Sequence, residues 1–166
     1  TLYRSSSTGE VTTSLSLPDK IDGRAEIQFA SDWLMAGMHN QLYRYTPATS
    51  VASQVAGSWP QITGLATFGP NLYVLDTEAG QIWKYPATGT SFGERTGYLK
   101  TTDGAGLQDA QSLAIDGDVF VLFTNGTIQK FTRGTKVDGW SLSGLPAPRS
   151  TIANARLLTT RSEDSH

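Results

Sequence analysis

The chain has 166 residues, including 17 glycines and 7 prolines but no cysteine. Its 13 basic and 15 acidic residues are interspersed and leave a formal net charge of −2, so nothing marks a nucleic-acid partner or binding to an anionic membrane. Without cysteine there are no disulfides, thiolate metal sites or cysteine nucleophile, and apolar runs of about five residues fall far short of the roughly 20 needed to span a membrane as a helix. We expect a soluble protein that does not insert into membranes.

A four-residue phrase recurs along the chain. Its copies are Thr-Leu-Tyr-Arg, Gln-Leu-Tyr-Arg, Gln-Ile-Trp-Lys and Thr-Ile-Gln-Lys, beginning at residues 1, 41, 81 and 127. A period of about 40 to 46 residues indicates a repeat architecture whose units bury their apolar surface against each other.

The remaining strands are predicted around these copies, each of which is the third strand of its unit. In chain order, the predicted strands are 1–4 (third), 11–17 (outer), 25–29 (inner), 33–36 (second), 41–44 (third), 50–56 (outer), 62–68 (inner), 72–75 (second), 81–84 (third), 96–100 (outer), 111–116 (inner), 119–123 (second), 127–130 (third), 137–142 (outer) and 155–159 (inner). Short length and apolar, β-branched and aromatic residues favour strands over helices.

Turn residues separate each second strand from the third. The segments are 37–40, 77–80 and 124–126, and the last contains Asn125-Gly126. This pair predicts a two-residue hairpin turn, because both central residues of the favoured turn need positive φ. The second and third strands are therefore expected to be antiparallel neighbours.

Alternation along the middle strands predicts burial on both faces. Leu72 and Val74 point one way, while Tyr73 and Leu75 point the other. A sheet packed between two neighbours needs this pattern, and Tyr43, Trp83 and Leu122 are expected to be largely buried. We therefore predict an all-β fold: a β-propeller of four-stranded antiparallel blades, about four of them, over residues 1–160, followed by a polar tail at 161–166.

The strand count leaves one blade incomplete. Fifteen strands are predicted, one short of four blades, and the missing one is a second strand. Bare sheet edges favour pairing with another chain. We therefore expect the chain to be part of a larger ring, either as a piece of a longer polypeptide or as one protomer, so that a protein partner or a second copy completes it.

The third full unit carries the strongest resemblance. Its segments 111–122, 125–131 and 142–145 resemble NHL- and TolB-like propeller repeats of bacterial proteins, particularly propellers attached to PPM-type phosphatase or signalling modules. The resemblance covers roughly residues 33 to 160 and implies a propeller fold in a bacterial protein, as an extracytoplasmic or surface-attached domain. In such relatives, a segment like 157–160 is followed by another Leu-Tyr-Val-Leu-Asp strand, which is absent here.

Candidate binding residues lie at the ends of inner strands and in loops. Related propellers such as lactonases and streptogramin lyases place a metal or a catalytic histidine at the channel mouth, which here corresponds to the entrances and starts of the inner strands. The candidates for ligand binding are Gln61, Asp109, Arg156, Trp59 and Trp140, of which the tryptophans could stack on a sugar. The cations Arg4, Arg44, Lys84 and Lys130 recur once per unit, and we expect them to lie along apolar neighbours.

Catalytic chemistry is not expected from the residues present. Of the two histidines, His39 falls in a predicted turn and His166 is the last residue, so neither suits a rigid triad. Asp116-Gly117-Asp118 is explained by a turn, and we expect no metal site and no cofactor. The leading hypothesis is a non-catalytic binding or scaffolding module that presents loops and blade edges. The alternatives are a lactonase- or lyase-type enzyme acting at the channel and a carbohydrate-binding propeller.

Overall fold

The computed structural model describes residues 2–5, 8, 11–15, 25–30, 33–38, 40–46, 51–55, 57–88, 91–100 and 106–143, and every structural statement below concerns these residues. They form antiparallel sheets and no α-helix; one short 3-10 helix, η1 (Leu107–Asp109), precedes an inner strand. No helix in this part of the chain is long and apolar enough to cross a membrane.

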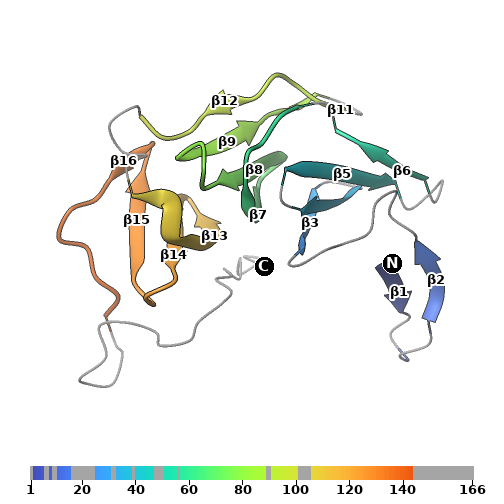
Figure 1. Ribbon diagram of the computed structural model, residues 1–166, viewed down its shortest axis with the longest axis horizontal. Helices are drawn as coiled ribbons and strands as arrows, with labels where there is room; N and C mark the ends of the chain where they lie inside the picture. Colours follow the sequence, from blue (N-terminus) through green and yellow to red (C-terminus); the bar gives the residue numbers. More distant parts are fainter. Residues whose placement is uncertain are drawn as a thin grey trace, which may run out of the picture.

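Three four-stranded sheets stand side by side in an arc (Figure 1). The first contains β3 (Ala25–Ala30), β4 (Trp33–Met38), β5 (Gln41–Thr46) and β6 (Val51–Gln54); the second contains β7 (Ile62–Phe68), β8 (Asn71–Asp76), β9 (Gln81–Tyr85) and β12 (Thr96–Gly97); the third contains β13 (Ala110–Asp116), β14 (Asp118–Phe123), β15 (Ile128–Thr132) and β16 (Thr135–Lys136). β1 (Leu2–Ser5) pairs with β2 (Val11–Leu15), and β10 (Ala87–Thr88) pairs with β11 (Ser91–Phe92). We refer to the four-stranded sheets as blades 1, 2 and 3.

The predicted all-β class and the four-stranded antiparallel blades are confirmed. In blade 2, Leu72 pairs with Tyr85 and Leu75 with Ile82, which is the predicted register of the second and third strands. The sheet β1–β2 matches the third and outer strands predicted at the start of the chain. The inner strand predicted at 155–159 and the tail at 161–166 lie outside the described residues.

The outer strand predicted at 137–142 was wrong, because blade 3 turns earlier. Arg133 and Gly134 both have positive φ, 51° and 81°, and the tight turn they make brings Thr135 back opposite Thr132. Only one further backbone bond, from Val137 N–H to the Lys130 carbonyl, extends this pairing. The hairpin β10–β11, which lies between β9 and β12 in the chain, was not predicted.

The turn at Asn125-Gly126 also differs from the predicted two-residue type. Only Gly126 has positive φ, 79°, and its N–H donates to the Phe123 carbonyl at 2.9 Å. Thr124 and Asn125 therefore form the centre of an ordinary turn, and Gly126 follows it as a bulge that rejoins the strand. The Asn125 side-chain oxygen accepts from Thr127 N–H and from its hydroxyl, which closes the turn.

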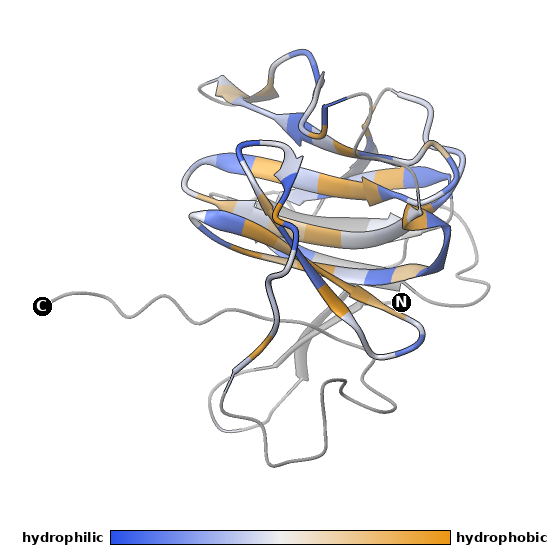
Figure 2. Cartoon of the chain, turned by 90° about the vertical axis from the view of Figure 1, so that its left-hand side faces the viewer, coloured by the Kyte–Doolittle hydropathy of each residue, from blue (hydrophilic) through white to orange (hydrophobic). Residues whose placement is uncertain are grey.

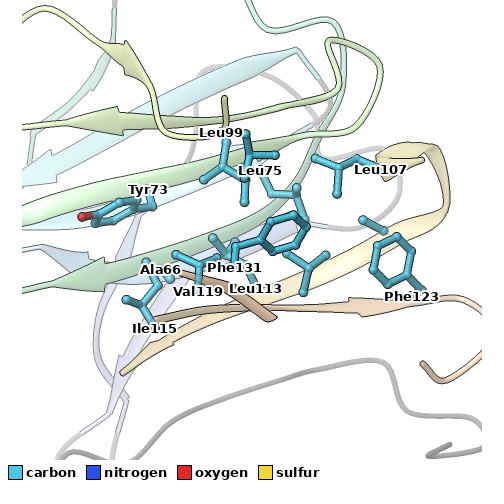
Figure 3. Close-up of a cluster of buried hydrophobic side chains, with 13 residues drawn as sticks. Ala66, Tyr73, Leu75, Leu99, Leu107, Leu113, Ile115, Val119, Phe123 and Phe131 are labelled. Atoms are coloured by element: carbon cyan, nitrogen blue, oxygen red, sulfur yellow. The ribbon is translucent and has the colours of Figure 1, made fainter. Parts of the chain in front are cut away.

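The core lies between the blades. Tyr73 and Leu75 join a cluster with residues of blade 3, which Figure 3 shows around Leu113, whereas Leu72 and Val74 join a second cluster on the blade 1 side. Apolar segments accordingly band the strands in Figure 2, with polar residues toward their ends. The predicted burial on both faces of the second strand is confirmed for blade 2.

Two of the three residues predicted to be largely buried are so. Tyr43 and Leu122 are 1% and 0% exposed, but Trp83 is only partly buried. Its indole lies beside the second core cluster and carries the guanidinium of Arg95 on one ring face, 4.2 Å from the ring centroid. Trp83 is thus a boundary residue whose outer face is covered by a cation.

Inner strands of neighbouring blades approach closely at Gly64. A Cβ atom there would lie 2.7 Å from Leu113 Cδ2 and 3.2 Å from Leu113 N. The absence of a side chain at this residue lets β7 lie against β13 and brings the entrances of the two inner strands together.

Candidate functional site

The starts of β7 and β13 form the same structure in successive blades. The carbonyl of Gln61 accepts a hydrogen bond from Thr77 N–H at 3.0 Å, and the carbonyl of Asp109 accepts one from Thr124 N–H at 2.9 Å. Their main chains are thereby fixed, while the Gln61 side chain is half-buried and that of Asp109 exposed. The structure places these two predicted residues at equivalent ends of adjacent inner strands.

A bulge follows each of these residues. The register shifts between Ile62 and Gly64 in blade 2 and between Ala110 and Ser112 in blade 3, so Thr63 and Gln111 are the extra residues. Bulges re-aim side chains and occur often beside functional sites. Thr63 and Gln111 hence occupy corresponding positions, two residues beyond Gln61 and Asp109.

Both bulge residues carry a buried oxygen without a hydrogen-bond partner: Thr63 Oγ1 and Gln111 Oε1. A buried polar atom left unpaired costs about 1–3 kcal/mol, and native structures contain few of them. Two at equivalent positions of neighbouring strands therefore mark a place where donors from a ligand or from water fit. We call Gln61, Thr63, Asp109 and Gln111 the inner-strand entrance.

The buried carboxylate of Asp76 fixes the main chain at this entrance. Its side chain is fully buried; Oδ1 accepts from the backbone N–H groups of Gln61 and Ala79, at 3.1 and 3.2 Å, and Oδ2 from the indole N–H of Trp83 at 3.3 Å. One carboxylate thus ties the segment before β7 to the β8–β9 turn and to β9. Its oxygens are occupied by structural bonds, so the role of Asp76 is to position Gln61.

The tryptophans predicted as stacking platforms lie elsewhere. Trp59 is 1% exposed and packs against Tyr85, with ring centroids 6.3 Å apart, so its ring is not open to a sugar in this arrangement. Trp140 is half-buried against Phe120, with centroids 5.5 Å apart. The structure does not bring either one to the inner-strand entrance. Arg156 and both histidines lie outside the described residues.

Of the recurring cations, Lys130 shows the predicted arrangement most clearly. Its ammonium lies 5.8 Å from the centroid of the Phe120 ring and 2.7 Å from Asp118 Oδ2. Hydrogen bonds from Lys130 and Thr132 lower the pKa of Asp118. Asp118 itself pairs with Asp116 across the predicted turn at Gly117. Within the described ranges, no group of three His, Cys, Asp or Glu side chains could hold a metal ion.

Sequence reasoning missed Thr63 and Gln111. Aligning the repeats on Leu65 and Leu113 directs attention to the residues one and four positions earlier, whereas the bulge residues stand two positions earlier. A bulge changes the face to which a side chain points, and repeat alignment alone does not show it. The nearest signal was that both positions carry a polar residue just after the apolar first residue of the strand, Ile62 in β7 and Ala110 in β13.

Removing the unpaired hydroxyl should not weaken the fold. We expect Thr63→Val to leave the free energy of unfolding unchanged or to raise it by up to about 1 kcal/mol, because Val keeps the shape without the buried hydroxyl. Ser112→Ala is the control: Ser112 is 2% exposed and its hydroxyl is not among the unpaired buried atoms, so this change should destabilise by about 1 kcal/mol. Urea unfolding measures both, and a loss above about 1 kcal/mol in Thr63→Val would show that the hydroxyl has a structural role.

No model of a protein family matches the sequence, and no curated protein matches it. Several solved structures are similar to this chain. A candidate gluconolactonase is 16% identical with a TM-score of 0.58, over 78% of this chain and 52% of its own. PorZ, a bacterial surface component of the type-IX secretion system of Porphyromonas gingivalis, is 15% identical with a TM-score of 0.54, over 78% and 18%. Hydrazine synthase of Kuenenia stuttgartiensis is 16% identical with a TM-score of 0.50, over 78% and 38%.

The chain therefore spans about half the length of the candidate gluconolactonase and less of the other two. At this level of identity the likeness concerns the fold alone. Together with the three antiparallel four-stranded sheets, it shows that this chain has the β-propeller fold.

Proposed function

We propose that the chain belongs to a β-propeller that binds a ligand without transforming it, and that the inner-strand entrance is its binding surface. The observation that carries this proposal is the pair of buried, unpaired oxygens on Thr63 and Gln111 at equivalent bulges of neighbouring blades. Leaving these two oxygens without hydrogen bonds lowers the stability of the fold. Proteins usually retain such unpaired polar atoms where they bind the polar groups of a ligand.

The two oxygens indicate which ligand groups fit. The Gln111 side-chain oxygen only accepts hydrogen bonds, whereas the Thr63 hydroxyl can donate or accept. Gln61 adds an amide and Asp109 an exposed carboxylate acceptor. A neutral ligand rich in O–H or N–H donors, such as a sugar or a peptide amide, matches this set better than an anion does. This agrees with the carbohydrate-binding alternative while replacing tryptophan stacking by hydrogen bonding.

A lactonase is the second candidate, and the likeness to a candidate gluconolactonase favours it. Such an enzyme would need more carboxylates or histidines at the channel than the described residues provide there, supplied by the rest of the ring. We also propose that the propeller is of the NHL- or TolB-like type, and the sequence pattern of residues 111–131 supports this.

One pair of assays separates binding from catalysis. Incubated with glucono-δ-lactone, with and without added Ca²⁺ or Zn²⁺, the protein should hydrolyse the lactone no faster than buffer. A panel of neutral monosaccharides should shift the backbone amide NMR signals of Thr77 and Thr124, which donate to the carbonyls of Gln61 and Asp109. Hydrolysis above background that Asp109→Asn abolishes would instead establish the enzyme.

We further propose that a second copy completes the ring. Phe120 and Trp140 of blade 3 pack on each other but stay only partly buried, and Leu142 is 37% exposed. A propeller blade gains stability from a neighbour on each face. Two copies would give about eight blades, near the upper end of the usual range. Light scattering at micromolar concentration should give twice the 17.9 kDa mass of one chain. A monomer that stays cooperative and unaggregated throughout would contradict this.

A further inference from the structure

A groove separates blades 1 and 2 at their outer edges, where β6 and β11 lie near each other in Figure 1. Its wall is formed by Arg44 of blade 1 and Val55 just after β6, and by Tyr85 of blade 2 and Phe92 of the hairpin β10–β11. The groove has a volume of about 260 Å³. A neighbouring hollow of about 630 Å³ shares Tyr85 and Phe92 and is also lined by Arg95. The two hollows therefore adjoin each other, and we refer to them together as the depression.

The cation in this depression is held in a fixed orientation. The Arg95 guanidinium lies over the Trp83 ring at 4.2 Å and near the Trp59 ring at 5.7 Å, and its Nη1 donates to the Ser58 carbonyl at 2.8 Å. A guanidinium stacked on aromatic rings keeps a planar edge for a carboxylate. Arg44 adds a second positive charge on the opposite wall.

Two buried hydrogen-bond donors adjoin Arg95 without a partner of their own. The indole nitrogen of Trp59 and the hydroxyl of Tyr85 make no hydrogen bond of ordinary length and angle, although their residues are only 1% and 5% exposed. Burial raises the pKa of Tyr85, and weak hydrogen bonding from the Arg95 guanidinium and the Trp59 indole lowers it. Both donors therefore face the Tyr85 oxygen, and the Tyr85 O–H proton still needs an acceptor. An indole N–H can only donate, so the group missing here is an acceptor.

The residues around these donors indicate the chemistry of the ligand that would supply the acceptor. Val55 and Phe92 give the depression an apolar wall, and the two arginines outnumber the one carboxylate, Glu94, on its rim. We infer that the groove between blades 1 and 2 binds a carboxylate carried on an apolar body, with Arg95 and Tyr85 holding the carboxylate and Phe92 contacting the body. This site shares no residue with the inner-strand entrance, so it does not depend on the proposed function.

Such a carboxylate could belong to a free acid or to the C-terminus of a polypeptide. The experiment titrates the purified chain with 3-phenylpropionate and with the peptide Gly-Gly-Gly-Phe, each against its amide, and follows tryptophan fluorescence, which should respond because Trp59 and Trp83 contact Arg95. We expect both carboxylates to bind at least about tenfold more tightly than their amides. Tighter binding of the peptide would identify a polypeptide C-terminus as the natural source, and equal or weaker binding a free acid.

Variants separate the site from the fold. Tyr85→Phe removes only the unpaired hydroxyl, so it should leave the unfolding midpoint unchanged or raised and weaken carboxylate binding about tenfold. Arg95→Gln should weaken binding further, whereas Arg133→Gln, which removes an exposed cation from the turn of blade 3, should not. Equal binding of carboxylates and amides, or full binding by Tyr85→Phe and Arg95→Gln, would overturn the proposal.

Discussion

Replacing Asp76 with alanine is expected to lower the free energy of unfolding by about 3–5 kcal/mol. The carboxylate is fully buried and accepts three hydrogen bonds, two from backbone N–H groups and one from the Trp83 indole. Removing it leaves three donors without their acceptor, and each charge-assisted bond contributes about 1.5–3 kcal/mol. The effect should exceed that of any surface substitution in blade 2.

Two milder variants show how much the individual hydrogen bonds of Asp76 contribute to this loss of stability. Asp76→Asn can keep the acceptor for the Gln61 and Ala79 amides but presents a donor to the Trp83 indole, so it should cost less than alanine. Trp83→Phe removes the indole bond while keeping an aromatic ring beneath Arg95, and it should cost about 1–2 kcal/mol. Urea unfolding followed by far-UV circular dichroism measures all three. A loss below about 1 kcal/mol in Asp76→Ala would mean that the carboxylate does not hold the blade together.

Much of the fold follows from two periodicities in the sequence. The recurrence at residues 1, 41, 81 and 127 predicts repeated units, and the alternation of apolar residues on both faces of 72–75 predicts a sheet packed between neighbours. Local pattern decides these features, because the side-chain period of a strand and the burial of its faces are properties of a few adjacent residues.

Local turns and hairpins that residue preferences do not suggest account for the strands that the sequence did not predict. The outer strand of blade 3 was placed too late because the turn at Arg133-Gly134 needs positive φ at an arginine, which residue preferences do not suggest. The hairpin β10–β11 is an insertion that the repeat does not contain.

The candidate sites were harder to predict than the strands. Asp76 ends the second strand of blade 2, and its side chain accepts a hydrogen bond from a segment fifteen residues earlier. The groove joins Arg44 to Arg95 across two blades. Gln61 and Asp109 were chosen from the repeat alignment, and the structure places them at equivalent strand entrances, but the unpaired oxygens beside them become visible only when the bulges are known.

Substituting alanine for Gly134 is expected to destabilise the contact between blades 2 and 3 by about 3 kcal/mol or more. Gly134 has φ +81°, and a Cβ atom there would lie 2.1 Å from the Tyr98 carbonyl oxygen. The neighbouring Gly134 carbonyl accepts from Lys100 N–H at 2.9 Å, and the Tyr98 hydroxyl donates to the Phe131 carbonyl at 3.3 Å. The turn therefore cannot move away without breaking the bonds that join the two blades.

Gly117→Ala and Gly139→Ala are the matched controls, because both glycines have φ +72° and neither would bring a Cβ atom within 4 Å of another group. They should cost only about 1 kcal/mol, the penalty for a left-handed alanine. The excess loss in Gly134→Ala then measures the close approach of the blades. Hydrogen exchange provides the second readout: the Lys100 amide, which bonds to Gly134, should lose protection in Gly134→Ala alone. If all three variants lose equal stability, the backbone angle accounts for the whole effect and the blades do not depend on this contact.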